Sequence, residues 1–395
     1  MYRVGKEEVK AVERIIKSKQ YFRMADGKSG CFQECDKFEK EWSKFTGSKH
    51  SLLMSGGGTA GLICALAGLE IGPGDEVIVP AYTFMASASA VLCVGAIPVI
   101  AEVDDSLMLD PVDVEKKISK RTKAIMPVHL LGLTCDMGKL MALANKYKLF
   151  VVEDACQASG VTYNGIKVGK IGHAGAYSFN YFKTITCGEG GAVVTDSKKV
   201  FERALVYHDS GANFRPFAKK LSIPVFLGMQ FRASEIMGAM LRVQLKRLPG
   251  ILKDLRKIKN RISGELASAQ NIYFVRSNDG QGEAGAGLHF QFENEKIARK
   301  FASAPGVAGT LPIDSGKHVY SNWGPILEHR IGVTRATNPY FFAANKGLNM
   351  KYSKTMCPKT LDILRRSVRV GVNPEWKEKD IENKIRVIRK AGESL

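Results

Sequence analysis

The chain has 395 residues and lacks an uninterrupted apolar run long enough to form a membrane helix. Its most apolar stretch, about residues 86–101, is interrupted by two serines and by Pro98. It therefore falls short of the roughly 20 apolar residues that a spanning helix needs. The first ten residues are charged where a secretory signal has an apolar core. We expect neither membrane insertion nor export.

Patterns typical of metal sites are also missing. The eight cysteines are scattered, and the close pair Cys31 and Cys35 has no second Cys or His pair at zinc-finger spacing. No stretch is rich enough in Pro, Gly or Ser to indicate disorder. We expect a packed protein with no metal, free thiols and a cytoplasmic location.

Acidic side chains are in deficit, with 39 Asp and Glu against 58 Lys and Arg, which gives a formal net charge of +19. Charge of this sign is what polyanions bind, so nucleic acid must be considered. The basic residues are nevertheless interleaved with acidic ones, as in KEKDIENKIRVIRK, and this is typical of solvated helix faces. We expect no nucleic acid, and infer that the positive potential concentrates an anionic small substrate.

Short β-rich runs alternate with helical patterns through the first part of the chain. The runs are 77–79, 98–103, 124–128, 149–153, 176–179 and 192–195, and helical spacing occurs between them at 111–120 and 137–147. This alternation predicts an α/β domain whose central sheet is mostly parallel. The active site of such a sheet lies at the carboxyl ends of its strands.

The character of the chain changes after about residue 244. A basic helical stretch at 245–266 leads to two alternating runs, HFQFE and SVRVGV. They predict a smaller α+β domain at 245–395, following a large domain at 1–244. At the C-terminal end, Asn373 is the expected N-cap of a last helix and Pro374 its first residue.

Four stretches carry candidate chemistry: MSGGGTAGL (54–62), PAYTFMAS (80–87), VVEDACQASG (151–160) and SFNYFKTITCGEGGAVV (178–194). The glycines of the first favour a phosphate at a helix N-terminus, although an ordinary turn has the same composition. In the second, Phe84 is suited to lie flat on a heterocycle or to join the core.

In the third stretch, Asp154 ends an apolar strand, where a charge needs a cation or hydrogen bonds. A structural ion pair or a helix cap is the alternative. In the fourth, Lys183 stands among apolar residues, which favour the free amine that reacts with an aldehyde. An exposed loop lysine is the alternative there. Together, the four stretches supply the parts needed to hold pyridoxal phosphate (PLP).

The order SGGGT, PAYTF, EDACQA, SFNYFK, GEGG and GMQFRASE resembles the DegT/DnrJ/EryC1/StrS family of sugar aminotransferases over nearly the whole chain. The resemblance implies a fold type I, aspartate-aminotransferase-like PLP enzyme. By resemblance, Lys183 binds the cofactor aldehyde, Asp154 pairs with the ring nitrogen, Gln157 lies near the ring hydroxyl, Phe84 stacks on the ring, and Gly58, Thr59 and Ser178 contact the phosphate.

One position departs from the family pattern. The family shows Gly-x-Asn-x-Arg where this chain reads GMQFR, so Gln230 replaces an asparagine that reaches the phosphate in the neighbouring subunit. Glutamine has the same amide on a longer stem. The resemblance thus implies a homodimer with shared active sites, in which Gln230 binds the partner's cofactor.

The resemblance implies transfer of an amino group from L-glutamate to an oxo sugar, with pyridoxamine phosphate as the intermediate form. Dehydratases of the family carry histidine at the lysine position, whereas this chain has Lys183. A non-catalytic relative is expected to have lost Lys183, Asp154 or Gln157, and all three are present.

Stretches such as ECDKFEKEWSKFTG and VYSNWGPIL look similar to the branch that makes 8-amino-3,8-dideoxy-manno-octulosonate, an amino form of the lipopolysaccharide sugar Kdo. Nucleotide-linked keto sugars as acceptors and glutamine as donor remain open. The candidate substrate contacts are His129, His318, Tyr320, Asn322 and Trp323, and an ordinary core or surface role is the alternative for each.

Overall fold

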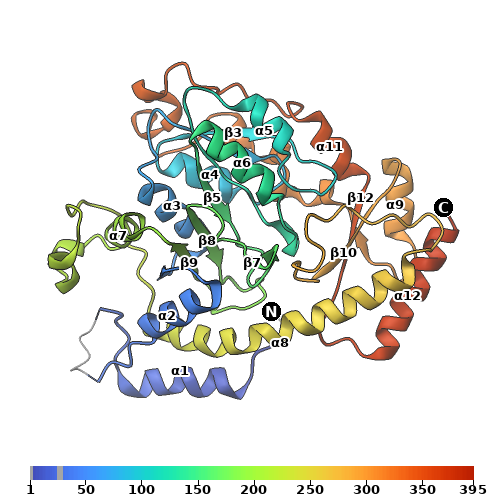
Figure 1. Cartoon of the computed structure of the whole chain (residues 1–395), viewed down its shortest axis with the longest axis horizontal. Coiled ribbons are helices and arrows are strands. Elements are labelled where there is room, and N and C mark those ends of the chain that lie inside the picture. Colours follow the sequence, from blue (N-terminus) through green and yellow to red (C-terminus); the bar gives the residue numbers. More distant parts are fainter. Residues whose placement is uncertain (1–2, 25–29) are drawn as a thin grey trace.

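A sheet of seven strands forms the centre of the computed structural model, which describes residues 3–24 and 30–395 (Figure 1). The strand order is β1-β9-β8-β5-β4-β2-β3. The strands are β1 (His50–Met54), β2 (Glu76–Pro80), β3 (Ile97–Ala101), β4 (Thr122–Ile125), β5 (Phe150–Asp154), β8 (Ala174–Ser178) and β9 (Gly191–Thr195). Only β9 runs against its neighbours, so the predicted mostly parallel sheet is confirmed.

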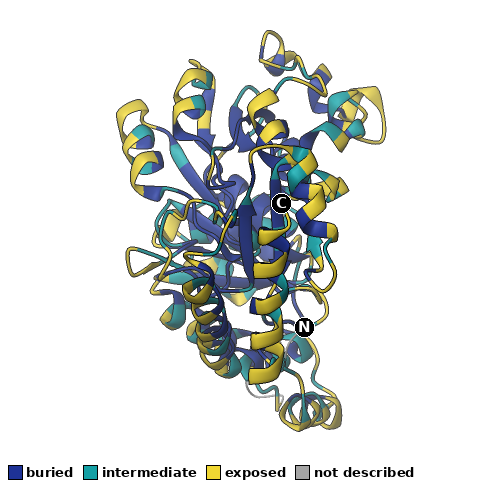
Figure 2. Cartoon of the chain, turned by 90° about the vertical axis from the view of Figure 1, so that its right-hand side faces the viewer, coloured by how far each residue is buried: buried dark blue, intermediate teal, exposed yellow. Residues whose placement is uncertain are grey.

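The central strands are buried because helices cover both faces of the sheet. β2 and β3, with the sequences EVIVP and IPVIA, are buried at every position, as expected for strands that face no water. In β1 the side chains alternate, so that Leu52 joins one hydrophobic cluster and Leu53 the other. Figure 2 shows this buried centre surrounded by helices with exposed outer faces.

The helices of the larger part are α1 (Lys6–Ser18), α2 (Glu34–Thr46), α3 (Gly57–Gly68), α4 (Ala86–Cys93), α5 (Pro111–Lys117), α6 (Met137–Tyr147), α7 (Lys198–Tyr207) and α8 (Glu235–Leu266). α3 is almost entirely apolar and lies between the sheet, α4 and α7. α6 has the predicted bounds, and Asp136 caps it by accepting a hydrogen bond from the backbone N–H of Lys139.

A second sheet, in the order β10-β12-β11, lies beside the C-terminal half of α8 (Figure 1). It consists of β10 (Gly287–Gln291), β11 (Gly309–Thr310) and β12 (Ser367–Gly371), with helices α9 (Glu295–Ser303), α10 (Gly324–Leu327), α11 (Pro358–Arg365) and α12 (Glu378–Glu393). A short hairpin, β6 (Thr162–Tyr163) and β7 (Ile166–Lys167), and several 3₁₀ turns complete the described elements. The two predicted strands of this region are present.

The predicted start of the last helix is wrong. Asn373 caps a tight turn, in which its Oδ1 accepts from the backbone N–H of Glu375 at 3.0 Å. The helix begins at Glu378, and Asp380 accepts a hydrogen bond from the N–H of Lys377 at 2.9 Å. The Asn-Pro pair therefore formed a turn ahead of the helix.

The division of the chain at residue 244 stays a prediction. α8 runs from Glu235 to Leu266 without interruption and joins the two sheets. The segment after β11 also returns to the large sheet: Val319 belongs to the same hydrophobic cluster as β2 and β3, and the Tyr352 hydroxyl donates to the carbonyl of Pro98 at 2.7 Å.

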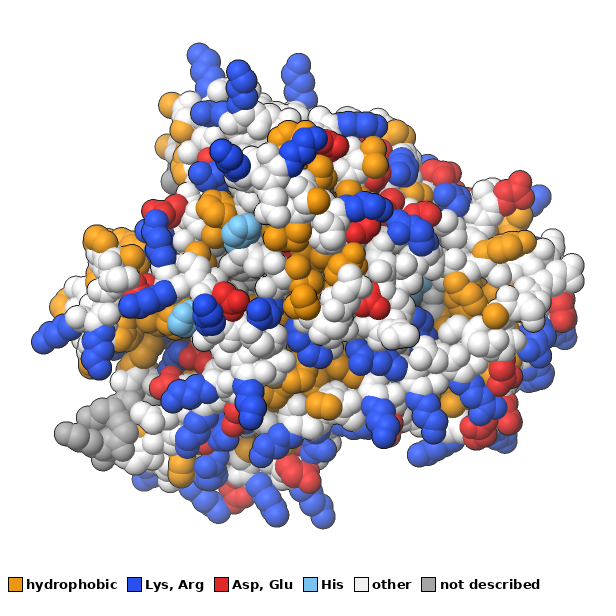
Figure 3. Space-filling model, viewed as in Figure 1, with side chains coloured by type: hydrophobic (Ala, Val, Ile, Leu, Met, Phe, Trp, Pro, Cys, Tyr) orange, Lys and Arg blue, Asp and Glu red, His pale blue; other side chains and the backbone are white. Residues whose placement is uncertain are grey.

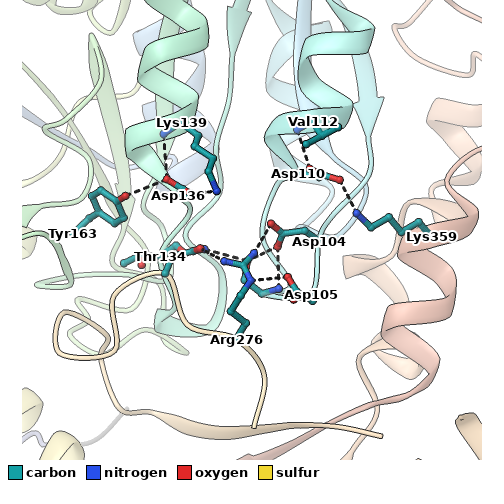
Figure 4. Close-up of polar contacts among 12 residues, drawn as sticks. Asp104, Asp105, Asp110, Val112, Thr134, Asp136, Lys139, Tyr163, Arg276 and Lys359 are labelled. Carbon is teal, nitrogen blue, oxygen red and sulfur yellow. Dashed lines mark hydrogen bonds and ion pairs between the residues drawn. The ribbon is translucent and has the colours of Figure 1, made fainter. Parts of the chain in front are cut away.

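Polar contacts between the two parts appear in Figure 4. Arg276, in the segment before β10, bonds to Asp104 and to Asp105 at 2.7 Å each. Lys359, at the start of α11, bonds to Asp110 at 2.7 Å. These side chains are partly exposed, so each pair adds little to stability and serves mainly to fix the orientation of the second part.

Basic side chains are spread over the face of the molecule seen in Figure 3, with acidic ones among them. Within residues 3–24 and 30–395, no helix is long and apolar enough to cross a membrane.

The start of α2 is anchored on α8. The carboxylate of Glu235 accepts hydrogen bonds from the backbone N–H groups of Glu34 at 2.6 Å and Cys35 at 3.2 Å, where negative charge stabilises a helix N-terminus. One turn further along α8, Gly238 lies so close that a Cβ there would be 2.5 Å from the nitrogen of Cys35.

We predict that Gly238→Ala destabilises the protein by about 1–3 kcal/mol, because its methyl group meets backbone that cannot move aside. Gly250→Ala is the matched control in the same helix, since the nearest atom to its Cβ is 3.7 Å away on the flexible side chain of Arg3. It should stabilise the helix by about 0.5–1 kcal/mol. Urea unfolding followed by tryptophan fluorescence measures both, and equal effects of the two substitutions would contradict the proposed packing.

Candidate active site

A cavity of about 540 Å³ opens at the carboxyl ends of β5 and β8, beside the N-terminus of α3. This is the edge at which sheets of this kind bind ligands. The predicted site residues that line the cavity are Gly58, Thr59, Phe84, Asp154, Gln157, Ser178, Lys183 and His318. Residues from four separate predicted stretches are therefore brought together around one space.

The glycine-rich turn between β1 and α3 forms one wall. Gly57 has a φ of +69°, which favours glycine, and a Cβ at Gly58 would overlap the sulfur of Cys156 and lie 3.1 Å from Cβ of Ser178. No side chain in the described part of the chain caps the start of α3, which leaves its first N–H groups without a side-chain partner there. This wall suits a phosphate, which helix N-termini bind through such groups.

The carboxylate of Asp154 forms a second wall at the end of β5, with 5% of the residue exposed. Oδ2 accepts a hydrogen bond from the hydroxyl of Ser87 at 2.7 Å, and Oδ1 accepts one from the N–H of Cys156 at 3.1 Å. Ser87 in turn lies 2.8 Å from the hydroxyl of Thr83. These bonds hold the carboxylate in place, and no described lysine or arginine forms an ion pair with it.

Lys183 lies in the loop between β8 and β9. The loop is held by backbone bonds from Tyr181 to Gly188 at 2.8 Å and from Lys183 to Asn180 at 2.9 Å. The side chain is half-buried, and its Nζ has no hydrogen-bond or ion-pair partner among residues 3–24 and 30–395. The amine therefore remains available for chemistry inside the cavity.

The position of the Lys183 amine shows in the pKa values of its neighbours. Burial raises the pKa of the Cys156 thiol, Asp154 raises it further, and the charge of Lys183 opposes this rise. Burial also lowers the pKa of His318, and the charges of Lys317 and Lys183 lower it further. Lys183 is thus close enough to Cys156 and His318 for its charge to be felt by both.

Phe84 and the 317–318 segment form the roof. The rings of Phe84 and His318 have centroids 5.6 Å apart, and Nζ of Lys317 lies 5.3 Å from the Phe84 ring. Backbone bonds join the two segments, from Thr83 N–H to the His318 carbonyl at 2.9 Å and from Met85 N–H to the Lys317 carbonyl at 3.2 Å. The C-terminal part of the chain thus completes a cavity built on the large sheet.

The side chain of Gln157 is held in place by a hydrogen bond to its amide oxygen. Its Oε1 accepts a hydrogen bond from the N–H of Leu131 at 3.1 Å, and because Gln157 lines the cavity, its amide N–H groups remain available as donors there.

Two of the predicted substrate contacts, His129 and Tyr320, are buried outside the lining of the cavity. His129 binds Glu153 through Nε2 at 3.0 Å and accepts from the N–H of Cys135 through Nδ1 at 3.2 Å. The Tyr320 hydroxyl bonds to backbone at Lys354 and Cys357, each at 2.9 Å. These polar atoms are satisfied by protein, and neither His129 nor Tyr320 lines the cavity.

Trp323 and Asn322 support the roof instead. Trp323 is fully buried, and its Nε1 donates to the carbonyl of Lys317 at 3.0 Å. The Asn322 amide donates to the carbonyl of Gly316 at 3.0 Å. Neither lines the cavity, and their hydrogen bonds hold the turn that carries Lys317 and His318.

Gln230 is exposed and does not line the cavity of its own chain. Its Oε1 accepts from the N–H of Arg232 at 2.9 Å. The neighbouring Phe231 accepts a backbone bond from Ser55 at 2.8 Å, which places this segment beside the glycine-rich turn.

Sequence reasoning missed Ser87, Lys317 and Arg369. Ser87 is one of the two serines that interrupt the apolar run at 86–101, and a serine within such a run is the available signal for a buried hydroxyl. Arg369 is the charged residue in the middle of the run SVRVGV, a position that faces the cavity once β10 and β12 pair. In the described residues no cluster of three or more metal-ligating side chains occurs.

A family model described as the DegT/DnrJ/EryC1/StrS aminotransferase family matches residues 3–300. The chain belongs to this family. The predicted family, its fold type, its aminotransferase activity and its PLP cofactor are thereby confirmed at the level of the family.

Named relatives support this assignment. GDP-perosamine synthase of Vibrio cholerae is 38% identical over 244 residues, a match that covers 62% of this chain and 65% of that protein. The chain thus spans just under two thirds of that relative. Spore coat polysaccharide biosynthesis protein SpsC of Bacillus subtilis is 28% identical, with 98% and 94% of the two chains covered. The aminotransferase structure from Psychrobacter cryohalolentis has a TM-score of 0.79 at 28% identity and covers 100% of this chain and 99% of that one.

The cavity fits PLP. The crowded glycine turn at the start of α3 suits the phosphate and the buried carboxylate of Asp154 suits a protonated ring nitrogen. The amine of Lys183, which has no partner among the described residues, suits the aldehyde. The cofactor, when bound, supplies a ring that accepts electrons from a carbanion.

We predict that Gly58→Ala weakens PLP binding at least tenfold, because the new methyl group overlaps Cys156 and displaces the phosphate wall. In the double variant Gly58→Ala, Cys156→Ala the sulfur is gone, so binding should recover in large part. Equilibrium titration of cofactor-free protein with PLP, followed by its absorbance, measures both. Equal loss in the single and double variants would show that the overlap is not the cause.

Proposed function

We propose that the protein is a PLP-dependent aminotransferase that transfers the amino group of L-glutamate to an oxo sugar. The proposed acceptor is 8-oxo-3,8-dideoxy-manno-octulosonate, and the product is 8-amino-3,8-dideoxy-manno-octulosonate for lipopolysaccharide. The observation that carries the reaction is the meeting of Lys183, Asp154 and the glycine turn in one cavity. A cytoplasmic location is part of the proposal.

Lys183 is the proposed catalytic base. Its Nζ would hold the cofactor through the aldehyde, and as a free amine it would accept the proton that leaves the α-carbon of the donor. The absence of a described ion-pair partner keeps Nζ free to move between these tasks. The same atom returns a proton in the reverse half of the reaction.

Asp154 is proposed to keep the ring nitrogen protonated. Its carboxylate is oriented by Ser87 and by the N–H of Cys156, and each oxygen still has a lone pair for another donor. Ser87 is thus a positioning residue, which acts on the cofactor only through Asp154.

The other residues that line the cavity are proposed to bind the cofactor and to orient it. Phe84 is proposed to stack on the ring, Gln157 to donate to its hydroxyl, and Ser178 to join Gly58 and Thr59 at the phosphate. Together these residues would hold the cofactor ring and exclude water from the cavity.

The choice of a free sugar acid rests on charge. Lys317 and Arg369 line the cavity in addition to Lys183, and the chain carries a formal net charge of +19. An acceptor with a carboxylate benefits from such a site. A nucleotide-linked keto sugar is the second candidate, because relatives carry names such as GDP-perosamine synthase and dTDP-3-amino-3,6-dideoxy-alpha-D-galactopyranose transaminase.

The half-reactions test this choice. The PLP-loaded protein is first converted to its pyridoxamine phosphate form with L-glutamate, and then receives either the 8-oxo sugar acid or nucleotide-linked 4-keto sugars. We predict that only the sugar acid restores the PLP absorption, and that Lys183→Ala gives neither half-reaction because it has no base. A response to nucleotide sugars alone would replace the proposed acceptor, and no reaction with glutamate or glutamine would remove the proposed activity.

We also propose that the protein is a homodimer with shared sites. Apolar side chains are strongly exposed near the cavity and in the segment before α8: Phe182 at 80%, Phe214 at 85%, Leu227 at 85% and Met229 at 52%. Exposed apolar residues in such number favour an interface. In a dimer, Gln230, which lies outside its own cavity, is proposed to bind the phosphate in the partner subunit.

We predict that the double variant Phe214→Asp, Leu227→Asp is a monomer, since a buried unpaired carboxylate disfavours association. It should also hold PLP more weakly, because Gln230 loses its target. Light scattering after size-exclusion chromatography measures the mass. Val333→Asp is the control, because Val333 is 97% exposed but lies in another segment. A monomeric parent protein, or a dimeric double variant, would contradict the proposal.

A further inference from the structure

The segment between α10 and α11, residues 328–357, forms a basic surface of the molecule. One of its residues, Glu328, is acidic, and five are basic: Arg330, Arg335, Lys346, Lys351 and Lys354. All six are exposed. Arg121 adjoins the same surface, since its Nη2 donates a hydrogen bond to the carbonyl of Ala344 at 3.0 Å. The segment lies at the top of Figure 1, and Figure 3 shows lysine and arginine side chains that project from the top of the molecule.

This basic surface is fixed to the large sheet. The amide of Asn345, which is fully buried, donates to the carbonyls of Gly95 at 2.9 Å and Pro339 at 2.8 Å. The backbone N–H of Asn349 donates to the carboxylate of Glu76 at 2.9 Å. Because the inner side of the segment is anchored in this way, its outward side chains are presented from a defined backbone.

Two apolar side chains lie among the cations of the basic surface. Val333 is 97% exposed, beside a turn in which the N–H of Thr334 donates to Oγ1 of Thr337 at 3.0 Å. Phe341 is 49% exposed, and the guanidinium carbon of Arg335 lies 4.4 Å from the centroid of its ring. Single exposed apolar residues are ordinary. Here they share one segment with five cations, so the same surface offers both kinds of contact.

Most cations of the basic surface have no carboxylate beside them. Arg330 lies 2.9 Å from Glu328, and within the described chain the other four basic residues of the segment form no ion pair. Elsewhere the cations are paired: Arg247 of α8 lies 2.6 Å from both Glu7 and Glu8 of α1. Positive charge is therefore concentrated on residues 328–357 and attracts an anionic partner.

The surface of an anionic phospholipid bilayer fits both features. Its phosphates attract lysine and arginine, and its headgroup layer takes up exposed apolar side chains. Nucleic acid would use the cations but would gain nothing from an aliphatic side chain such as Val333. The pairing of apolar and basic side chains on one fixed surface therefore favours a bilayer.

We propose that residues 328–357 bind the surface of an anionic phospholipid bilayer, with Val333 and Phe341 in the headgroup layer and the cations at the lipid phosphates. Binding of this kind is attachment to the surface and involves no spanning helix. No residue of the segment lines the cavity, so this proposal is independent of the proposed function.

Sedimentation with vesicles tests the proposal on the full chain. The protein is mixed with vesicles of phosphatidylcholine alone, or of phosphatidylcholine with phosphatidylglycerol. We expect binding to the second kind only, and we expect it to weaken as NaCl is added, because salt screens the attraction. A parent protein that does not bind the anionic vesicles would overturn the proposal.

The double variant Lys346→Glu, Lys351→Glu tests the position of the charge. Its Kd for the anionic vesicles should rise at least about tenfold, since each cation near such a surface contributes roughly a factor of five. Lys246→Glu, Lys253→Glu is the matched control, because it makes the same change of net charge on the exposed face of α8. It should bind nearly as tightly as the parent. Equal weakening in the two double variants would mean that only net charge matters, against the proposal.

The double variant Val333→Ser, Phe341→Ser removes the apolar contacts at constant charge. Its affinity for the anionic vesicles should fall about threefold or more, whereas its binding to polyglutamate, a soluble acidic chain, should stay as in the parent. Vesicle binding equal to that of the parent, or tighter binding of the parent to polyglutamate than to vesicles, would assign the surface to an acidic protein instead. Loss of a dimer in this variant, measured by light scattering, would assign it to a second copy of the chain.

Val333→Trp tests the site of contact without weakening it. Of the three tryptophans of the chain, Trp42 and Trp323 are fully buried and Trp376 is partly buried, so the new side chain is the exposed reporter. Its fluorescence should shift to shorter wavelength on the anionic vesicles and be quenched by brominated lipid. Lys246→Trp is the control on α8 and should show neither effect. Unchanged emission of Val333→Trp on vesicles that bind the protein would place the contact elsewhere and overturn the proposal.

Discussion

Asp154 carries its carboxylate at the end of a central strand with 5% of the residue exposed, and the site is built around the need to hold that charge. The hydroxyl of Ser87 and the N–H of Cys156 satisfy it in part. Neither is a cation, so the carboxylate keeps its ability to bind a positively charged partner. A structural ion pair at this position would have cancelled that ability.

The hydrogen bond from Ser87 to Asp154 links the carboxylate to parts of the chain that are distant in sequence. Ser87 belongs to α4, and the segment just before α4 is bonded through its backbone to the carbonyls of Lys317 and His318. The turn that carries these two residues is held from beneath by Trp323 and Asn322. A change in the C-terminal part can therefore reach the carboxylate of Asp154 through few contacts, although it lies far away in sequence.

Much of the fold, and the part of the cavity proposed to bind the cofactor, could be predicted because the sequence patterns that specify them are local. Apolar runs fixed the positions of β2 to β5, and glycines that no larger residue can replace mark the turn at Gly57 and Gly58. β1 was not predicted, because HSLLM is short and lacks the β-branched residues that distinguish a strand. The start of α12 was misplaced because Asn-Pro begins a turn as readily as a helix.

The substrate side was harder to predict because it depends on pairings between distant segments. His129 and Tyr320 had the right residue types, but Glu153 and the backbone at Cys357 satisfy them inside the core. Arg369 was not expected at all, since its place in the cavity follows from the register of β12 against β10. A single sequence contains the alternation of SVRVGV but not the strand that lies opposite.

The charged side chains of the cavity allow two anions to be bound at the same time. Lys183, Lys317 and Arg369 line it against the carboxylates of Asp154 and Glu189, and the Glu189 carboxylate accepts a bond from Asn180 at 2.8 Å. The space therefore has an excess of positive charge even before the helix N-terminus of α3 is considered. A phosphate at the glycine turn neutralises part of it, and the remaining cations stay available to a second anion. Because Lys317 and Arg369 belong to the C-terminal part and the glycine turn to the large sheet, a phosphate and a carboxylate can be bound at the same time without competing for the same donors.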